Sequence, residues 1–141
     1  MNNLIFASAF ILALGFSHVA QANTLTLCIR TNSSDGNIRA AIYADAAAFD
    51  RGTILTGKTL PAVSGTTKLT FSGLEPGSYG IALFQDLNGN EKLDRNLLGA
   101  PIEPFGFSNN PVIGFAAPTF EEFVVDFDGS PTTLNIILNG G

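Results

Sequence analysis

The sequence has few of the side chains on which catalytic and metal-binding proteins commonly depend. It has one cysteine, Cys28, one histidine, His18, and no tryptophan. A single cysteine cannot form a disulfide within the chain, and Cys28 is expected to pack as a small residue in a strand. Because His18 lies in a segment expected to be removed, the mature chain has no imidazole for Ser-His-Asp or Cys-His catalysis or for zinc ligation.

Charged residues are also scarce, at 13% of the 141 residues. The chain has seven Lys and Arg and twelve Asp and Glu, which gives a net charge of −5. A negatively charged domain is poorly matched to a polyanion, so nucleic acid is not expected as a partner. The apolar runs are shorter than the roughly 20 residues that a bilayer-spanning helix needs, so no transmembrane segment is predicted.

The N-terminus has the pattern of an export signal. An apolar run from Leu4 to Phe16 is followed by Ala20-Gln21-Ala22, a small-x-small cleavage site. We therefore predict a signal peptide over 1–22 and a mature domain over 23–141, located in the periplasm or secreted. The mature chain would have 119 residues (141 minus 22), which is enough for one domain.

Apolar and polar residues alternate with a period of two along much of the mature chain. Leu25, Leu27 and Ile29 share one face of the first expected strand, and 66–71, 123–127 and 134–138 repeat the pattern. Segment 78–84 is apolar on both faces, which predicts a central strand, and Asp45 is placed to cap a short helical turn. Turns rich in Gly, Pro and Asp separate these segments. The predicted fold is all-β, a single antiparallel Greek-key β-sandwich of about seven strands.

A loop rich in oxygen side chains follows the expected central strand. Asp86, Asn88, Asn90 and Asp94 occupy positions 1, 3, 5 and 9 of a spacing that wraps Ca²⁺ in known calcium loops. Position 12, a bidentate Glu in EF-hands, is Leu97 here, and the next acid able to replace it is Glu103. We predict a weak Ca²⁺ site, with a Kd of about 10⁻⁵ to 10⁻³ M. Its ligands would be Asp86, Asn88, Asn90, the backbone carbonyl of Lys92, Asp94 and Glu103. The alternative is a solvated turn, since Asn, Asp and Gly are common turn formers.

The chain shows no regular pattern from residue 87 to Pro118. Loops of this length inside a small domain are usually functional or held in place, so we expect this one to be ordered. Glu103 and segment 106–110 are predicted to fold back against the calcium loop. Four phenylalanines are candidates for an exposed sugar-binding platform, although packing of the loop onto the sandwich is favoured, because such platforms prefer rings with polar handles. They are Phe105, Phe107, Phe115 and Phe120.

An enzyme remains the competing interpretation. A glycosidase-like hydrolase needs two carboxylates across a cleft. Glu103 with Glu121, or Asp126 with Asp128, are candidate pairs, but nothing in the sequence brings either pair together. The sequence favours a non-catalytic binding or structural module, stabilised by Ca²⁺, over this hydrolase.

Several motifs resemble one bacterial family. Residues 74–90 (LEPGSYGIALFQDLNGN), Lys92-Leu93-Asp94, 99–103 (GAPIE) and 106–110 (GFSNN) resemble, in order and spacing, the family called DUF2141. The resemblance covers nearly the whole mature chain, although Gln85 and Leu87 depart from the family's usual His and polar residue. It implies an exported envelope protein without an assigned activity, whose partner is an unidentified protein or glycan of the cell envelope. The Pro-Gly-x-Tyr turn is also similar to that of transthyretin-like and carboxypeptidase-regulatory-like sandwiches, which are mostly non-catalytic.

Overall fold

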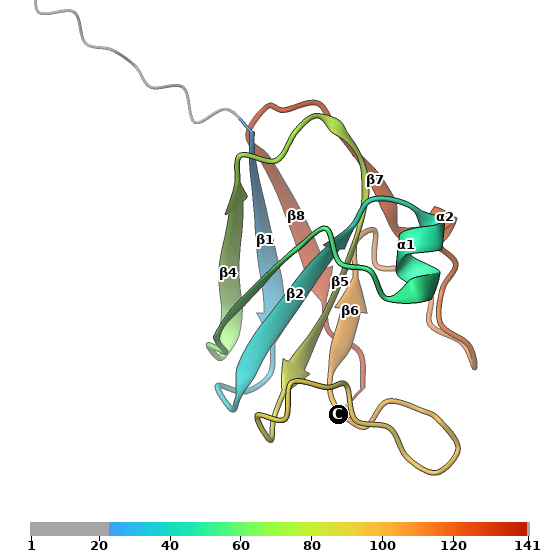
Figure 1. The fold of residues 1–141 in the computed structure, drawn as a ribbon. Helices are drawn as coiled ribbons and strands as arrows, with labels where there is room; N and C mark the ends of the chain where they lie inside the picture. The colour runs from blue at the N-terminus through green and yellow to red at the C-terminus, as the bar shows by residue number, and fades with distance from the viewer. Residues whose placement is uncertain (1–22, 141) are drawn as a thin grey trace, which may run out of the picture.

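The computed structural model describes residues 23–140, so the predicted signal peptide lies outside the described residues. Within this range the chain forms two packed β-sheets and two short helices (Figure 1). The smaller sheet has the order β4-β1-β8, and the larger has the order β3-β2-β5-β6, with β7 also paired to β5. The strands are β1 (Thr24–Thr31), β2 (Asn37–Tyr43), β3 (Thr56–Pro61), β4 (Gly65–Ser72), β5 (Gly77–Asp86), β6 (Phe105–Phe107), β7 (Val124–Phe127) and β8 (Thr132–Ile137), and the helices are α1 (Ala46–Arg51) and α2 (Phe120–Phe123).

The period-two pattern determines which side chains enter the core between the sheets. In β1 the alternating residues Leu25, Leu27 and Ile29 are buried, and β2 alternates in the same way from the opposite sheet. Burying such side chains contributes roughly 1.5–3 kcal/mol each, before the entropy of ordering the chain is subtracted. The prediction of an all-β sandwich is confirmed. The central position of β5 is also confirmed, because β5 pairs with β2, β6 and β7.

One strand pair differs from the predicted antiparallel arrangement. β8 runs parallel to β1, with Leu27 opposite Leu134, whereas the other strand pairs are antiparallel. The chain leaves β7 in the larger sheet and turns beside the start of β1, where Asn23 N donates to Gly129 O at 2.6 Å. β8 therefore enters the smaller sheet from the same end as β1. This crossing between sheets is a long-range event that alternation along the sequence does not encode.

Of the two helices, α1 was predicted from the sequence and α2 was not. Asp45 caps α1 as predicted, since its side chain accepts a hydrogen bond from Ala48 N at 2.7 Å. The single turn of α2 was not predicted, although Thr119 and Glu122 form a capping box at its start. Both helices lie beside the larger sheet (Figure 1).

The segment from Gly106 to Asn110 joins several strands. The Ser108 hydroxyl accepts a hydrogen bond from Ile81 N in β5 at 3.1 Å, and the Asn109 side chain donates to Val124 O at 2.7 Å. The Asn110 side chain donates to and accepts from the backbone of β8, at 2.9 and 2.8 Å. The prediction that this segment folds against the calcium loop is wrong, because its polar side chains bind the backbone of β5, β7 and β8 instead. The segment is ordered, as expected.

Candidate ligand groove and the loop at its rim

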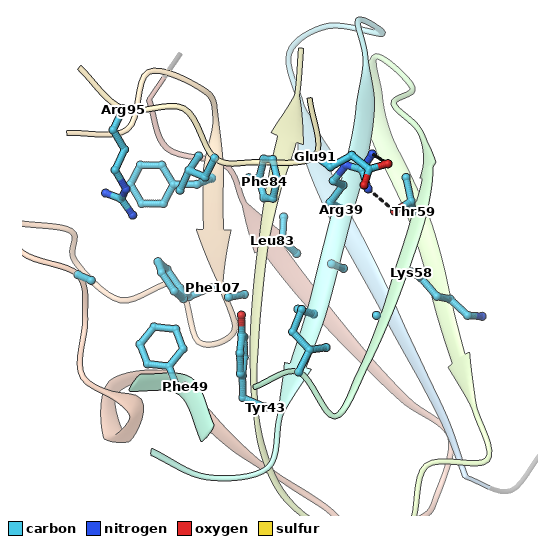
Figure 2. A pocket seen from close by; sticks show the side chains of 18 residues that line it. Arg39, Tyr43, Phe49, Lys58, Thr59, Leu83, Phe84, Glu91, Arg95 and Phe107 are labelled. Atoms are coloured by element: carbon cyan, nitrogen blue, oxygen red, sulfur yellow. Dashed lines mark hydrogen bonds and ion pairs between the residues drawn. The ribbon is translucent and has the colours of Figure 1, made fainter. Parts of the chain in front are cut away.

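A row of small residues crosses the outer face of the larger sheet. Ala41 in β2 lies opposite Gly57 in β3 on one side and Ala82 in β5 on the other. Ala82 in turn lies opposite Phe107 in β6. Paired residues of neighbouring strands project from the same face of a sheet, so the three small residues form a low strip across three strands. This strip is the floor of a groove of about 460 Å³ (Figure 2).

Larger side chains rise on both sides of this floor. Arg39 lies two residues before Ala41 in β2. It is opposite Thr59 of β3 on one side and Phe84 of β5 on the other, and Phe84 is opposite Phe105 of β6. This row forms one wall of the groove. On the other side, Tyr43 packs edge-on against Phe49 of α1, with ring centroids 5.2 Å apart.

An aromatic cluster fixes the end of the groove near the helices. Phe107 and Phe49 each contact Phe123 with ring centroids 4.9 Å apart, and Phe120 contacts Phe123 at 5.4 Å. Gly80 makes room for this cluster, because a Cβ at that position would lie 2.5 Å from the ring of Phe123. The cluster therefore holds α1 and α2 on the sheet.

The four phenylalanines considered for a sugar-binding platform do not share one role. Phe105 and Phe107 line the groove, and Phe120 packs in the cluster. The favoured interpretation, packing onto the sandwich, describes these three. Phe115 differs, since its side chain is fully exposed.

Tyr43 supplies a polar group to the otherwise apolar middle of the groove. Its hydroxyl is directed into the groove (Figure 2), and among the described residues it has no hydrogen-bond partner. Partial burial raises the pKa of Tyr43, so the hydroxyl stays protonated at neutral pH. It can therefore both donate to and accept from a bound molecule.

Asp86 links the groove wall to the loop that follows β5. Its carboxylate is fully buried and accepts from Arg39 Nε at 2.7 Å, Gly89 N at 2.8 Å and Glu91 N at 2.9 Å. Burial alone would raise the pKa of Asp86, but these hydrogen bonds outweigh it and hold the pKa below its ordinary value. The guanidinium of Arg39 also pairs with Glu91 at 3.2 Å. The wall residue Arg39 is thus positioned by the loop.

Glu103 closes the loop from the other side. Its side chain is buried, and its two oxygens accept from Leu87 N at 2.9 Å and from Asp94 N at 3.0 Å. The return of Glu103 to this loop is as predicted. Its carboxylate orders both ends of the loop by binding backbone N–H groups.

Asn88, Asn90 and Asp94 meet on the exposed side of the loop. The two amide groups donate to the Asp94 carboxylate at 2.6 to 3.0 Å. Their oxygens accept from backbone N–H groups two residues further on, and for Asn90 that group belongs to the exposed Lys92, at 3.0 Å. Glu91 has a φ of +67°, a left-handed conformation at the position where EF-hand loops have Gly.

These positions fit a bound cation only in part. Asn88, Asn90 and Asp94 converge, but Asp86 is turned to Arg39 and Glu103 to backbone N–H groups. Within residues 23–140, no cluster of three or more His, Cys, Asp or Glu side chains is arranged to hold a metal ion. A cation at this loop would have to compete with hydrogen bonds that already satisfy its ligands.

The carboxylate pairs considered for a hydrolase have separate structural roles. Glu103 lies beneath the loop, whereas Glu121 is exposed in α2. Asp126 accepts from Ser78 Oγ at 2.6 Å, and Asp128 accepts from a backbone N–H in its own turn. Among the described residues that line the groove, Glu91 alone carries a carboxylate, and it is paired with Arg39.

The fold and the site together define a class of protein, an all-β sandwich with an apolar groove on the outer face of one sheet and a hydrogen-bonded loop at its rim. The chain matches the family described as "uncharacterized protein conserved in bacteria (DUF2141)" over residues 29–135, and it belongs to that family. No curated protein and no solved structure matches it. Of the helices in the described part, neither is long and apolar enough to cross a membrane.

Proposed function

We propose that this protein is an exported, non-catalytic binding module of the bacterial cell envelope, and that the groove holds its ligand. The observation that carries the proposal is the row of Gly57, Ala41 and Ala82 between two rows of larger side chains. Three small residues in register leave space that an ordinary outer sheet face does not have. The volume of about 460 Å³ lies within the range of roughly 300–1,000 Å³ that is usual for ligand sites.

The lining suggests the chemistry of the ligand. Aromatic rings stand on both walls, and the polar groups are the Tyr43 hydroxyl and the side chains of Arg39, Lys58, Thr59, Glu91 and Arg95. Of these, Arg39 is paired with Glu91, while Lys58 and Arg95 donate to the backbone carbonyls of Thr70 and Gly99. A ligand with an apolar face and polar edges would satisfy both kinds of group. A short stretch of an envelope protein or glycan has this character. β3 is the edge strand of its sheet, so a longer chain can leave the groove across it.

A binding role is favoured over hydrolysis by the charges in the groove. Hydrolysis of the glycosidase type needs a second acid roughly 5–10 Å from the first. Among the described residues that line the groove, Glu91 is the one carboxylate, and it is paired with Arg39 at 3.2 Å rather than with a second acid. This supports the module over the hydrolase.

Filling the groove tests the proposal. Ala82→Phe places a ring over the floor without changing the core, because Ala82 faces outward between Ala41 and Phe107. The probe is 8-anilinonaphthalene-1-sulfonate, whose fluorescence rises in apolar sites. We expect the wild type to bind it and Ala82→Phe to lose most of the signal. Lys68→Phe, on the exposed face of the smaller sheet, is the matched control and should bind as the wild type does. Equal binding by all three proteins would refute a ligand site in the groove.

We also propose that Ca²⁺ stabilises the loop at the rim. The support is the 1-3-5-9 spacing, the convergence of Asn88 and Asn90 on Asp94, and the left-handed Glu91. An ion that binds only the folded loop adds about 2.7 kcal/mol at a hundredfold excess over Kd. Melting should move upward in millimolar Ca²⁺ relative to chelator. Asp94→Ala should abolish the shift, and Asp128→Ala should keep it. An unchanged melting temperature would refute the Ca²⁺ site and leave the groove proposal intact.

Export is tested separately from binding. The proposal requires cleavage after Ala22, so the mature protein should begin at Asn23. Mass measurement of the protein from periplasmic and extracellular fractions checks this directly. An uncleaved chain that stays in the cytoplasm would contradict the envelope role.

A further inference from the structure

Two loop tips carry large apolar side chains that are fully open to solvent. Leu97 and Leu98 are 106% and 94% exposed, and Val112 and Phe115 are 94% and 116% exposed. No other large hydrophobic side chain within residues 23–140 is more than 54% exposed. Single exposed apolar residues are common on protein surfaces, but four at this level on neighbouring tips need an explanation.

The first tip is a hydrogen-bonded turn. Asn96 N donates to Ala100 O at 2.8 Å, and the Asn96 side chain accepts from Leu98 N at 2.9 Å and Ala100 N at 3.1 Å. Arg95 Nη1 donates to Gly99 O at 2.9 Å and braces the base of the turn. These bonds hold Leu97 and Leu98 outward. A tip ordered in advance loses little conformational entropy when it is buried by a partner.

The two tips lie on the same side of the molecule, next to β6. A hollow beside β6 is lined by Ala100 and Pro101 from the first tip and by Val112 and Ile113 from the second. In Figure 1 the corresponding loops project side by side below and beyond the helices. Both tips can therefore meet one surface at the same time.

This part of the chain is nearly free of charge. Between Arg95 and Glu121 the one ionisable residue is Glu103, which is buried and bound to backbone N–H groups. The rest of the mature chain carries the other eleven acids and all seven Lys and Arg. Charges are costly to move into a membrane interface, whereas apolar tips gain from it. An uncharged pair of tips fits that environment.

We propose that these tips insert into the interface of a lipid bilayer and hold the module at the membrane surface. Protruding, separate tips suit a medium that deforms around them. A protein partner would need a complementary surface of about 800 Å² per side. Arg95 is the one cation at the tips among the described residues, so the interaction rests on apolar burial and needs no anionic lipid. The inference does not depend on the ligand of the groove.

The absence of tryptophan makes a direct test possible. Leu98→Trp places the sole tryptophan of the protein at a tip. With phosphatidylcholine vesicles its emission should shift to shorter wavelength and be quenched by brominated acyl chains. Val63→Trp is the control, because Val63 is 54% exposed in the turn between β3 and β4 and should show neither effect. No shift in Leu98→Trp, or equal shifts in both variants, would overturn the proposal.

A second experiment uses the native tips. In flotation with phosphatidylcholine vesicles, replacing both Leu97 and Leu98 by Ser should weaken partitioning about a hundredfold, since each buried leucine contributes roughly one factor of ten. Leu55→Ser with Val63→Ser, two half-exposed residues elsewhere, should leave it unchanged. Ala82→Phe should also leave it unchanged, which separates this result from a failure of the groove. A different outcome is that the wild type self-associates without binding vesicles, and that the Leu97→Ser, Leu98→Ser variant loses that self-association. This result would assign the tips to a second copy of the chain and overturn the membrane proposal.

Discussion

Removing the Asp86 side chain should destabilise the protein far more than removing that of Asp94, although both belong to the same loop. Asp86 is fully buried and accepts three N–H groups, one of them from Arg39. Asp94 accepts from the exposed amide groups of Asn88 and Asn90, which water can replace. The comparison tests whether the loop is stabilised mainly by the buried hydrogen bonds of Asp86 or by the exposed contacts of Asp94.

The magnitude follows from these contacts. A hydrogen bond to a charged group contributes about 1.5–3 kcal/mol, and a buried donor left without a partner costs about 1–3 kcal/mol. Solvent reaches Arg39 and the backbone of the loop, so the losses do not add fully, and we expect about 3 kcal/mol for Asp86→Ala. For a domain of this size that is a fall of roughly 10 °C in Tm. Asp94→Ala should cost about 1 kcal/mol or less, as exposed polar contacts usually do.

Urea and thermal unfolding of the two variants, followed by circular dichroism in chelator, measure this difference. Chelator excludes any effect of Ca²⁺ on Asp94. Equal losses for both variants, or a loss below about 1 kcal/mol for Asp86→Ala, would refute the internal hydrogen-bond account.

The other predictions concern the same root of the loop. The pKa of Asp86 is lower in the folded protein than its ordinary value of 3.8, so its contribution is present above pH 3.8 and is lost as the pH falls through the folded pKa. The difference in unfolding free energy between wild type and Asp86→Ala should therefore shrink below about pH 4, as acid titration of the unfolding transition would reveal; a constant difference argues against it. Gly36→Ala should be much more disruptive than Gly89→Ala. Both have positive φ, but a Cβ on Gly36 would lie 2.0 Å from Asp86 O, whereas one on Gly89 meets nothing within 4 Å and should cost about 1 kcal/mol. Similar Tm values for these two variants would contradict the packing of Gly36 against β5.

Much of the fold was predictable because alternation is a local signal. Leu25, Leu27 and Ile29 predict the buried face of β1, and the apolar faces of segment 78–84 predict the central β5. The edge strand β3 carries mostly exposed residues and gave no such signal. The parallel pairing of β8 depends on where the chain crosses between sheets, which no local pattern encodes.

The candidate site divides in the same way. The loop from Asp86 to Asp94 was visible in the sequence as a spacing, and so was the return of Glu103. The groove was not, because its floor is made by register: Gly57, Ala41 and Ala82 are far apart in the chain and meet only when β3, β2 and β5 pair. The role of Arg39 as the partner of Asp86 also required the pairing of β2 with β5.

Backbone amide shifts in solution test the central claim most directly. Isotope-labelled mature protein is titrated with 8-anilinonaphthalene-1-sulfonate. If the groove is the ligand site, the amide shifts should be concentrated on Ala41, Gly57 and Ala82 and on the aromatic residues of the walls. The amides of β1 and β4 should remain unchanged. Shifts confined to the smaller sheet, or no localised shifts at saturating probe, would contradict a ligand site in the groove.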